Sequence, residues 1–433
     1  MIFSPLARAI TLATAGSLLL AVPSLASADF IQDSKASLSL RNLYMNQDTR
    51  HDLSTDANKT NDEWSQGIIL QYESGFTEGT IGLGLDVYAA TGIKLDSGPN
   101  RTPDSFPTRS NGKSVDDFGK LGGTAKARIS KTILQVGTLM PRLPVVQSNL
   151  EGRLLPQIFT GGLLTSQEIK GLTARLGHID SVNQRSSTNH ERMQMNVLGK
   201  GLRDKKANTA LNGKNNKNYT SNSFDLANLN YKWNDSLATG YTFGRLEDLY
   251  KQHVIDVIHV VPLGDKRSLK TDLRFSRSSN DGQFNVDNKS FSGMTTYSFG
   301  FNKLGLSYQK MTGNTGFAYI NGADPFLVNY VTNRDFAAKD EMSWQVRHDY
   351  NFAGWGIPGL TVFNRFVKGT GADLGADRNE GREWERDLDI TYAFQEGALK
   401  NFSVRWRNAT VRSNIFKDLD DNRIILSYKL ALL

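Results

Sequence analysis

The sequence predicts an all-β protein that forms a transmembrane antiparallel β-barrel. Three observations lead to this prediction. Apolar and polar side chains alternate along many short segments, the N-terminus resembles an export signal, and no Pro/Gly/Ser-rich linker divides the 433-residue chain. Alternation with a period of two is typical of a strand with two unlike faces. Because lipid offers the backbone no hydrogen-bond partner, closed barrels and helices are the structures that cross a membrane.

Residues 1–28 have the features of a signal peptide. Arg8 precedes an apolar stretch over residues 9–22, and Ala26, Ser27 and Ala28 form a small-x-small cleavage site. A membrane-anchoring helix needs about 20 apolar residues, more than this stretch contains. We therefore expect export, with residues 29–433 as one mature domain that is periplasmic, secreted or inserted in the outer membrane.

Alternating segments recur along the mature chain, at residues 38–41, 81–88, 126–130, 342–347, 360–365, 402–407 and 423–432. Short turns such as residues 73–79 separate some of them. Longer polar stretches at residues 96–120, 183–222 and 369–381 suit extracellular loops. Strands of about 10 residues with connections of similar length give roughly 16 to 20 strands. Such a wide barrel contains a channel unless loops fold inward.

The last two segments show the two faces most clearly. Val404 and Trp406 alternate with Arg405 and Arg407, and the apolar positions from Ile424 onward alternate with a set that begins at Arg423. In a soluble sandwich the arginines would face water and the apolar set would pack a core. In a membrane barrel the apolar set faces lipid and the arginines line the lumen.

Composition excludes some kinds of site. The chain has no cysteine, which excludes disulfides and thiolate metal sites. Its six histidines are scattered without metal-ligand spacing, and Asp418, Asp420 and Asp421 lack the glycine and terminal glutamate of an EF-hand loop. We expect no catalytic centre, metal or cofactor. The net charge of +7 favours anionic cargo.

Several motifs in the same order resemble the OprD family of substrate-specific outer-membrane channels, across essentially the whole mature chain. The matching stretches are Leu40-Arg41-Asn42, Tyr72-Glu73-Ser74-Gly75-Phe76-Thr77, Arg128-Ile129-Ser130-Lys131-Thr132, Arg153-Leu154-Leu155-Pro156-Gln157, Leu246-Glu247-Asp248-Leu249-Tyr250 and Pro358-Gly359-Leu360-Thr361. The resemblance implies an 18-stranded barrel with inward-folded constriction loops, an eyelet, and a lumenal row of basic residues that conducts carboxylates. It also implies passive transport without a cofactor.

The resemblance assigns Arg153 on the constriction loop, and Arg405, Arg407 and Arg423 on the last two strands, to this basic row. Alternation independently turns the last three inward. Alternation also turns five other cations inward, namely Arg41, Lys126, Arg128, Arg347 and Arg365. The alternative for any one of them is a wall residue paired with a carboxylate such as Asp389 or Asp86.

The other side of the eyelet would come from residues 317–340, where the resemblance assigns Tyr319, Asp324 and Asp335 to a hydrogen-bonding and acidic wall. The alternative is that these acids only pin the loop. The chain departs from the basic-amino-acid members at Thr391 and Gln47, where they have a lysine and an arginine. Residues 404–410 and 421–423 look more like the branch that takes up cyclic and aromatic carboxylates.

The sequence thus predicts a channel for passive uptake of small carboxylates, aromatic or cyclic acids such as benzoate, through the outer membrane. A basic amino acid or peptide channel of the same family, an outer-membrane barrel enzyme and a non-selective or structural barrel are the alternatives. The expected partners are small carboxylates and outer-membrane lipids, without nucleic acid. Association into a homotrimer stays open.

Overall fold

The computed structural model describes residues 28–50, 59–99, 101, 105–148, 152–197, 219–282, 284–375 and 379–433. The signal peptide expected over residues 1–28 lies almost wholly outside this part, which begins with the short helix α2 (Ala28–Gln32). Among the described residues, no helix combines the length and the apolar character needed to cross a membrane.

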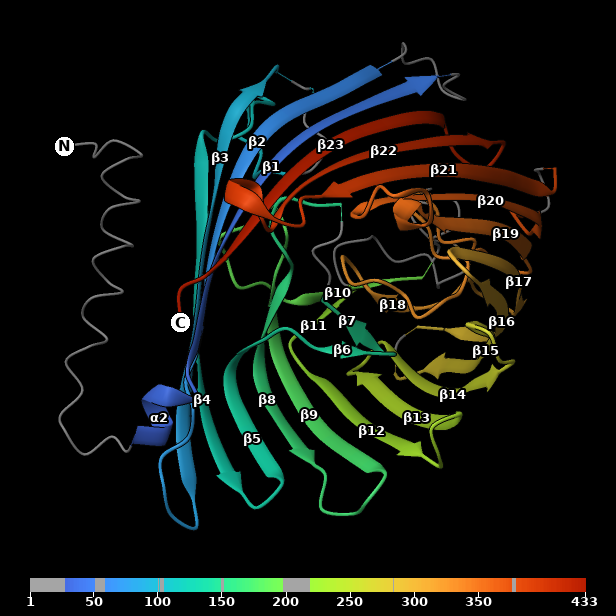
Figure 1. Ribbon diagram of the computed structural model, residues 1–433. Helices are drawn as coiled ribbons and strands as arrows, with labels where there is room; N and C mark the ends of the chain where they lie inside the picture. Colours follow the sequence, from blue (N-terminus) through green and yellow to red (C-terminus); the bar gives the residue numbers. More distant parts are fainter. Residues whose placement is uncertain are drawn as a thin grey trace.

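Eighteen antiparallel strands form one closed sheet, and the last strand pairs with the first (Figure 1). This confirms the predicted barrel and its strand number. The strands in order are β1 (Lys35–Arg50), β2 (Lys59–Glu73), β3 (Gly82–Ser97), β4 (Asp117–Ile129), β5 (Thr132–Leu139), β8 (Ile158–Ser166), β9 (Leu172–Asn183), β12 (Phe224–Lys232), β13 (Leu237–Leu246), β14 (Tyr250–Pro262), β15 (Arg267–Asn280), β16 (Asp287–Phe299), β17 (Asn302–Gly313), β19 (Met342–Asn351), β20 (Leu360–Ala372), β21 (Gly381–Ala393), β22 (Phe402–Ser413) and β23 (Asp418–Ala431).

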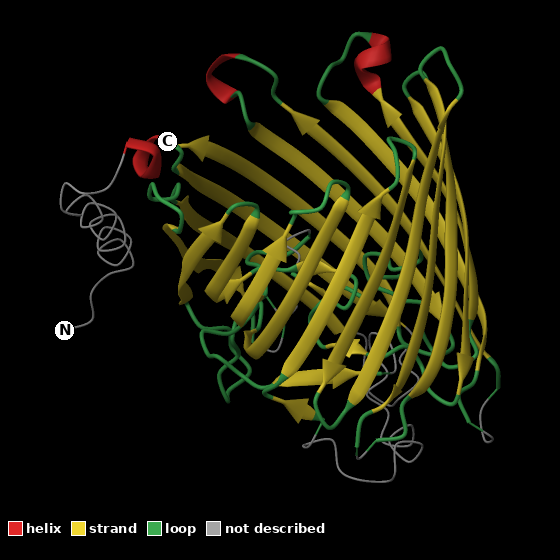
Figure 2. Cartoon of the chain, turned by 90° about the horizontal axis from the view of Figure 1, so that it is seen from below, coloured by secondary structure: helices red, strands yellow, loops and turns green. Residues whose placement is uncertain are grey.

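The two ends of the barrel differ. At one end the strands are joined by short turns, two of which contain the 3-10 helices η2 (Phe352–Trp355) and η3 (Gly397–Leu399) (Figure 2). At the other end lie the long connections, such as the one between Ser97 and Asp117. Short turns are periplasmic and long loops extracellular in barrels of the outer membrane.

The two faces of each strand follow the alternation in the sequence. On β22, Trp406 is 42% exposed on the outside, whereas the neighbouring Arg407 is 7% exposed toward the lumen. On β23, Ile424 is 45% exposed and Arg423 only 2%. Lipid therefore meets the apolar set, and the charged set is enclosed within the barrel.

Three extracellular connections fold back into the lumen (Figure 1). They carry the short strands β6 (Arg142–Leu143) and β7 (Val146–Gln147), then β10 (Met193–Asn196) and β11 (Thr220–Ser221), and finally β18 (Tyr319–Ile320). Because β10 pairs with both β11 and β18, two of these loops share one small sheet inside the barrel. Part of the connection expected over residues 183–222 is thus lumenal.

The inward loops are held to the wall by an apolar core. Loop residues such as Val146, Met193 and Ile320 pack in one buried cluster with wall residues such as Phe224 and Leu246. At roughly 25 cal/mol per Å² of apolar surface removed from water, such a cluster holds a loop in a fixed position. The narrow part of the lumen is therefore built on a rigid support.

Gly137 on β5 permits a close approach to β4 and supplies a test of the register. Its φ is +132°, and a Cβ there would lie 2.1 Å from the carbonyl oxygen of Gly123. We predict that Gly137→Val lowers the free energy of unfolding by about 2 kcal/mol or more, because both the backbone conformation and the contact become strained. Urea titration of the refolded barrel, followed by heat-modifiable gel mobility, measures this loss.

The matched control is Gly123→Val on the neighbouring strand. A Cβ at Gly123 meets only one atom, at 3.9 Å, and the residue is exposed on the outer face. Its variant should unfold like the parent protein. Equal stability of the two valine variants would contradict the register described for β4 and β5.

Candidate functional site

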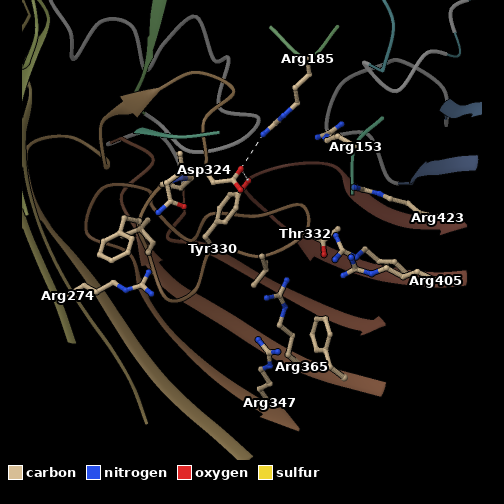
Figure 3. Close-up of a pocket in the computed structure, with 17 residues that line it drawn as sticks. Arg153, Arg185, Arg274, Asp324, Tyr330, Thr332, Arg347, Arg365, Arg405 and Arg423 are labelled. Carbon is tan, nitrogen blue, oxygen red and sulfur yellow. Dashed lines mark hydrogen bonds and ion pairs between the residues drawn. The ribbon is translucent and has the colours of Figure 1, made fainter. Parts of the chain in front are cut away.

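A cavity of about 420 Å³ lies inside the barrel, between the inward loops and the wall (Figure 3). Its lining is strongly basic. Eight arginines and one carboxylate line it, namely Arg153, Arg185, Arg274, Arg347, Arg365, Arg405, Arg407, Arg423 and Asp324. The arrangement is suited to hold an anion.

Register explains how residues distant in sequence form this row. Arg347 on β19 lies directly opposite Arg365 on β20, and Arg407 on β22 lies opposite Arg423 on β23. Neighbouring strands are about 4.8 Å apart, so the backbones of the two arginines in each pair are about one strand spacing from each other. Because barrel strands are tilted, a cross-strand row also changes height along the channel.

Carboxylates on the wall anchor the arginines. Asp389 accepts hydrogen bonds from Arg405, at 2.8 Å from Nε, and from Arg407, at 3.0 Å from Nε. Arg365 donates to Asp387 at 2.6 Å, and Arg423 makes a bidentate pair with Asp421. Two further arginines are anchored in the same way: Arg274 donates a hydrogen bond to Asp272 and Arg347 donates one to Asp349, each at 2.8 Å.

Most of the inward arginines pair with an aspartate, as the alternative interpretation of wall residues predicts. The same arginines also line the cavity, so pairing with a wall carboxylate is compatible with a role in conduction. The five anchoring aspartates are not among the cavity-lining residues. A guanidinium has five donor N–H groups, and a bidentate carboxylate engages two, which fixes the orientation of the side chain.

Two uncharged polar residues donate hydrogen bonds to the anchoring aspartates. Thr391 donates to Asp389 at 3.2 Å, and Gln47 donates to Asp421 at 3.0 Å. These are the two positions at which the resemblance described above implies a cation in the basic-amino-acid members. In place of additional cations, they hold the carboxylates that orient Arg405, Arg407 and Arg423.

The constriction loop rests directly on the arginine row. The carbonyl oxygen of Gly152 accepts a hydrogen bond from Arg423 Nη1 at 2.8 Å. A Cβ at Gly152 would lie 2.8 Å from Nη1 of both Arg407 and Arg423, and its φ is +73°. Glycine is therefore favoured here, and the following residue, Arg153, is brought to the cavity.

Aromatic rings support several of the guanidiniums. The guanidinium carbons of Arg347 and Arg365 lie 4.6 and 5.2 Å from the centroid of the Phe363 ring. That of Arg274 lies 3.9 Å from the Phe326 centroid. Cation–π contacts of this kind hold the guanidinium over a ring that itself borders the cavity.

The acidic side of the cavity contains only one of the predicted eyelet residues. Asp324 lines the cavity, accepts a hydrogen bond from Tyr330 Oη at 2.7 Å and pairs with Arg185 at 3.2 Å (Figure 3). Burial, followed by the charge of Asp324, raises the pKa of Tyr330 well above its usual value. Tyr330 therefore remains a neutral donor to Asp324 at physiological pH.

Tyr319 and Asp335 are buried within the same loop and hydrogen-bond to each other, and Asn196 donates to Tyr319 Oη at 2.7 Å. Neither lines the cavity. Their observed contacts fit the alternative in which they pin the loop, so their role in the eyelet stays a prediction.

Three predicted basic residues lie outside the cavity. Lys126 pairs with Asp86 at 2.5 Å and donates to the carbonyl oxygen of Ser74 at 2.9 Å. Arg128 lies over the Phe76 ring at 4.4 Å, close to a periplasmic turn. Arg41 is on the lumenal face of β1. Whether these three conduct substrate stays a prediction.

The structure adds two cavity arginines that the sequence interpretation did not include. Arg274 alternates with Leu273 and Phe275, which are exposed on the outer face, so the same parity rule would have found it. Arg185 lies on a lumenal connection without any periodicity and has no such signal. Across the described residues, no three His, Cys, Asp or Glu side chains gather in a way that could hold a metal ion.

The closed barrel, the inward loops and the arginine-lined cavity define an outer-membrane channel protein. Residues 28–432 match the family model described as outer membrane porin, OprD family. The chain belongs to the OprD family of porins, which confirms the predicted family and an outer-membrane location.

Individual relatives agree with this assignment. The porin-like protein GalP of Pseudomonas putida is 34% identical, and the alignment covers 93% of both chains. The crystal structure of Pseudomonas aeruginosa OpdQ is 48% identical with a TM-score of 0.83, covering 94% of this chain and all of that one. A structure of Pseudomonas aeruginosa OpdK with vanillate is 32% identical with a TM-score of 0.83, covering 93% of this chain and all of that one. As a porin of this family, the chain takes up small molecules.

Asp389 offers a test of the anchoring scheme. We predict that Asp389→Asn increases the permeability ratio of chloride to potassium roughly fivefold, because losing one negative charge changes the energies of chloride and potassium ions passing about 8 Å away in water by about 0.5 kcal/mol each, in opposite directions. The reversal potential of single barrels in a planar bilayer under a KCl gradient measures the ratio.

The control is Asp235→Asn, at an exposed periplasmic turn where the aspartate pairs with Lys232. It removes the same charge far from the cavity and should leave the reversal potential unchanged. A shift of equal size in both variants would show that the overall charge of the barrel, and not the anchored row, sets the selectivity.

Proposed function

We propose that this porin takes up small carboxylates, preferentially aromatic or cyclic acids such as benzoate, and that the lumenal arginine row guides them. The observation that carries the proposal is the imbalance of eight arginines against one carboxylate along one cavity. An anion that leaves water at this point exchanges hydration for forked hydrogen bonds from guanidiniums.

A row suits transport better than a single deep site. A carboxylate 4 Å from a guanidinium gains about 4 kcal/mol at an effective dielectric near 20, which partly offsets its lost hydration. Since Arg347 and Arg365 are cross-strand neighbours that remain partly exposed in the cavity, one contact can form before another breaks. Binding is then favourable enough to admit the anion, and weak enough at each step to release it.

Arginine fits this task better than lysine. The guanidinium keeps its charge at every physiological pH, presents a planar fork that matches a carboxylate, and tolerates partial loss of water. The aspartate pairs fix several of these forks in place, for example that of Arg365 on Asp387. Fixed donors need little reorganisation when the substrate arrives.

The preference for aromatic acids rests on planar surfaces in the cavity. Guanidiniums lie over the Phe363 and Phe326 rings, and a benzoate ring can stack on such planar groups while its carboxylate accepts hydrogen bonds from a neighbouring arginine. The structure of OpdK with vanillate, an aromatic carboxylate, adds support from a relative.

Arg153→Gln tests the conducting role of the loop arginine. We predict that benzoate flux into proteoliposomes falls about tenfold, while KCl conductance falls less than twofold. The substrate loses a forked contact worth roughly 1.5 kcal/mol in the narrow region, whereas small hydrated ions pass without it. Radiolabelled uptake and planar-bilayer conductance on the same preparation give the two values.

Arg267→Gln, at an exposed periplasmic turn where the arginine pairs with Asp265, is the matched control. It should change neither value. Equal losses of benzoate flux and KCl conductance in Arg153→Gln would remove Arg153 from the substrate path and indicate a general narrowing of the pore.

The competing assignment within the family is a channel for basic amino acids, and Asp324 is the feature that favours it, because this carboxylate faces the arginines across the cavity. Uptake of benzoate, arginine and an uncharged sugar of similar size by one preparation separates the assignments. Fast benzoate with slow sugar supports the proposal. Faster uptake of arginine than of benzoate would assign the chain to the basic-amino-acid branch. Equal uptake rates for all three solutes would indicate a non-selective porin.

A further inference from the structure

The outer face of the barrel carries a cationic and aromatic patch near its extracellular end. One cross-strand row over four neighbouring strands consists of Trp344 on β19, Lys368 on β20, Trp384 on β21 and Arg412 on β22. All four side chains point to the outer face of the barrel. The residues of the same strands that face the lumen are Arg347, Arg365, Asp387 and Arg407.

A second row lies one step deeper along the strands. There Phe366 is directly opposite Arg386. The Phe366 ring bridges the two indoles, with its centroid 5.7 Å from that of Trp344 and 5.7 Å from that of Trp384. The cations are thus interleaved with a continuous aromatic surface. We call these five residues, Trp344, Phe366, Lys368, Trp384 and Arg386, the outer patch.

Two cations of the outer patch have no carboxylate to compensate them. Arg412 beside the patch pairs with Asp420 at 2.9 Å. By contrast, Arg386 donates only to the neutral Asn408 Oδ1, at 2.9 Å, and Lys368 is exposed. Within the described ranges of the chain, neither Lys368 nor Arg386 has an acidic partner. Their charges face the membrane side of the barrel.

The height of the patch points to lipid headgroups. Lys368 is four residues from Ala372, where β20 ends, and Arg386 is five residues from Gly381, where β21 begins. Both ends face the extracellular connections. Aromatic girdles mark the membrane interfaces of such barrels, and a cation facing lipid is tolerated there when an anionic headgroup meets it.

We propose that the outer patch binds the phosphorylated sugar headgroup of an outer-leaflet glycolipid, the lipopolysaccharide class. A lipid phosphate accepts hydrogen bonds from Lys368 and Arg386, and the apolar C–H face of the sugar packs on the indole rings of Trp344 and Trp384. Charge complementarity selects this partner over a second copy of the barrel, since two copies would bring like charges together.

Native mass spectrometry of the detergent-purified barrel, titrated with bisphosphorylated lipid A, tests the proposal. We expect the Lys368→Gln, Arg386→Gln double variant to bind about 10- to 30-fold more weakly, from about fivefold for each cation. Lipid A without phosphates should bind the parent protein as weakly as the bisphosphorylated form binds the double variant.

Lys289→Gln is the matched control, because Lys289 is exposed on the outer face near the extracellular end of β16, two strands from β19, and is not part of the patch. It should bind like the parent protein. Unchanged heat-modifiable mobility and KCl conductance of the double variant show that it is folded.

Three results would overturn the proposal. The first is equal lipid A affinity in the double variant and the parent protein. The second is equal affinity of phosphatidylglycerol and lipid A, which would show general attraction of anions. The third is loss of a dimer or trimer in the double variant without loss of lipid A, which would make the patch an interface between copies.

Discussion

The structure depends on one constraint, which is that lipid provides no partner for a backbone N–H or C=O group. The pairing of β23 with β1, from Ser37 opposite Ala431 to Arg50 opposite Asp418, removes the two free edges that an open sheet would leave. Closure also fixes the parity of every strand. Once Trp406 and Ile424 face lipid, Arg405, Arg407 and Arg423 have to face the lumen.

Many arginines enclosed in one barrel need nearby negative charges. Buried or half-buried guanidiniums would repel each other without nearby carboxylates. The wall supplies these from the same strands, and Asp389 serves two arginines at once. The result has two layers, with aspartates in the wall and guanidiniums toward the cavity. Thr391 and Gln47, which bear no charge, complete the hydrogen bonding of the wall layer.

The barrel and the lumenal position of the C-terminal arginines could be predicted from the alternation of side chains, and the same rule would have found Arg274. The face to which a strand side chain points depends only on its position in the local alternation. The conformation of the inward loops was not accessible in this way. Arg185 meets Asp324, and Asn196 meets Tyr319, only after two connections far apart in sequence pair through β10 and β18. The distinction between Asp324 at the cavity and Asp335 inside the loop depends on that packing.

The apolar cluster between the inward loops and the wall gives this membrane protein a second interior resembling the core of a water-soluble domain. Residues such as Phe224 and Leu246 contribute to it from strands whose opposite faces meet lipid. The hydrophobic effect acts on this cluster only after the surrounding strands enclose it. The bore of the pore therefore depends on the packing of this interior as well as on the number of strands in the wall.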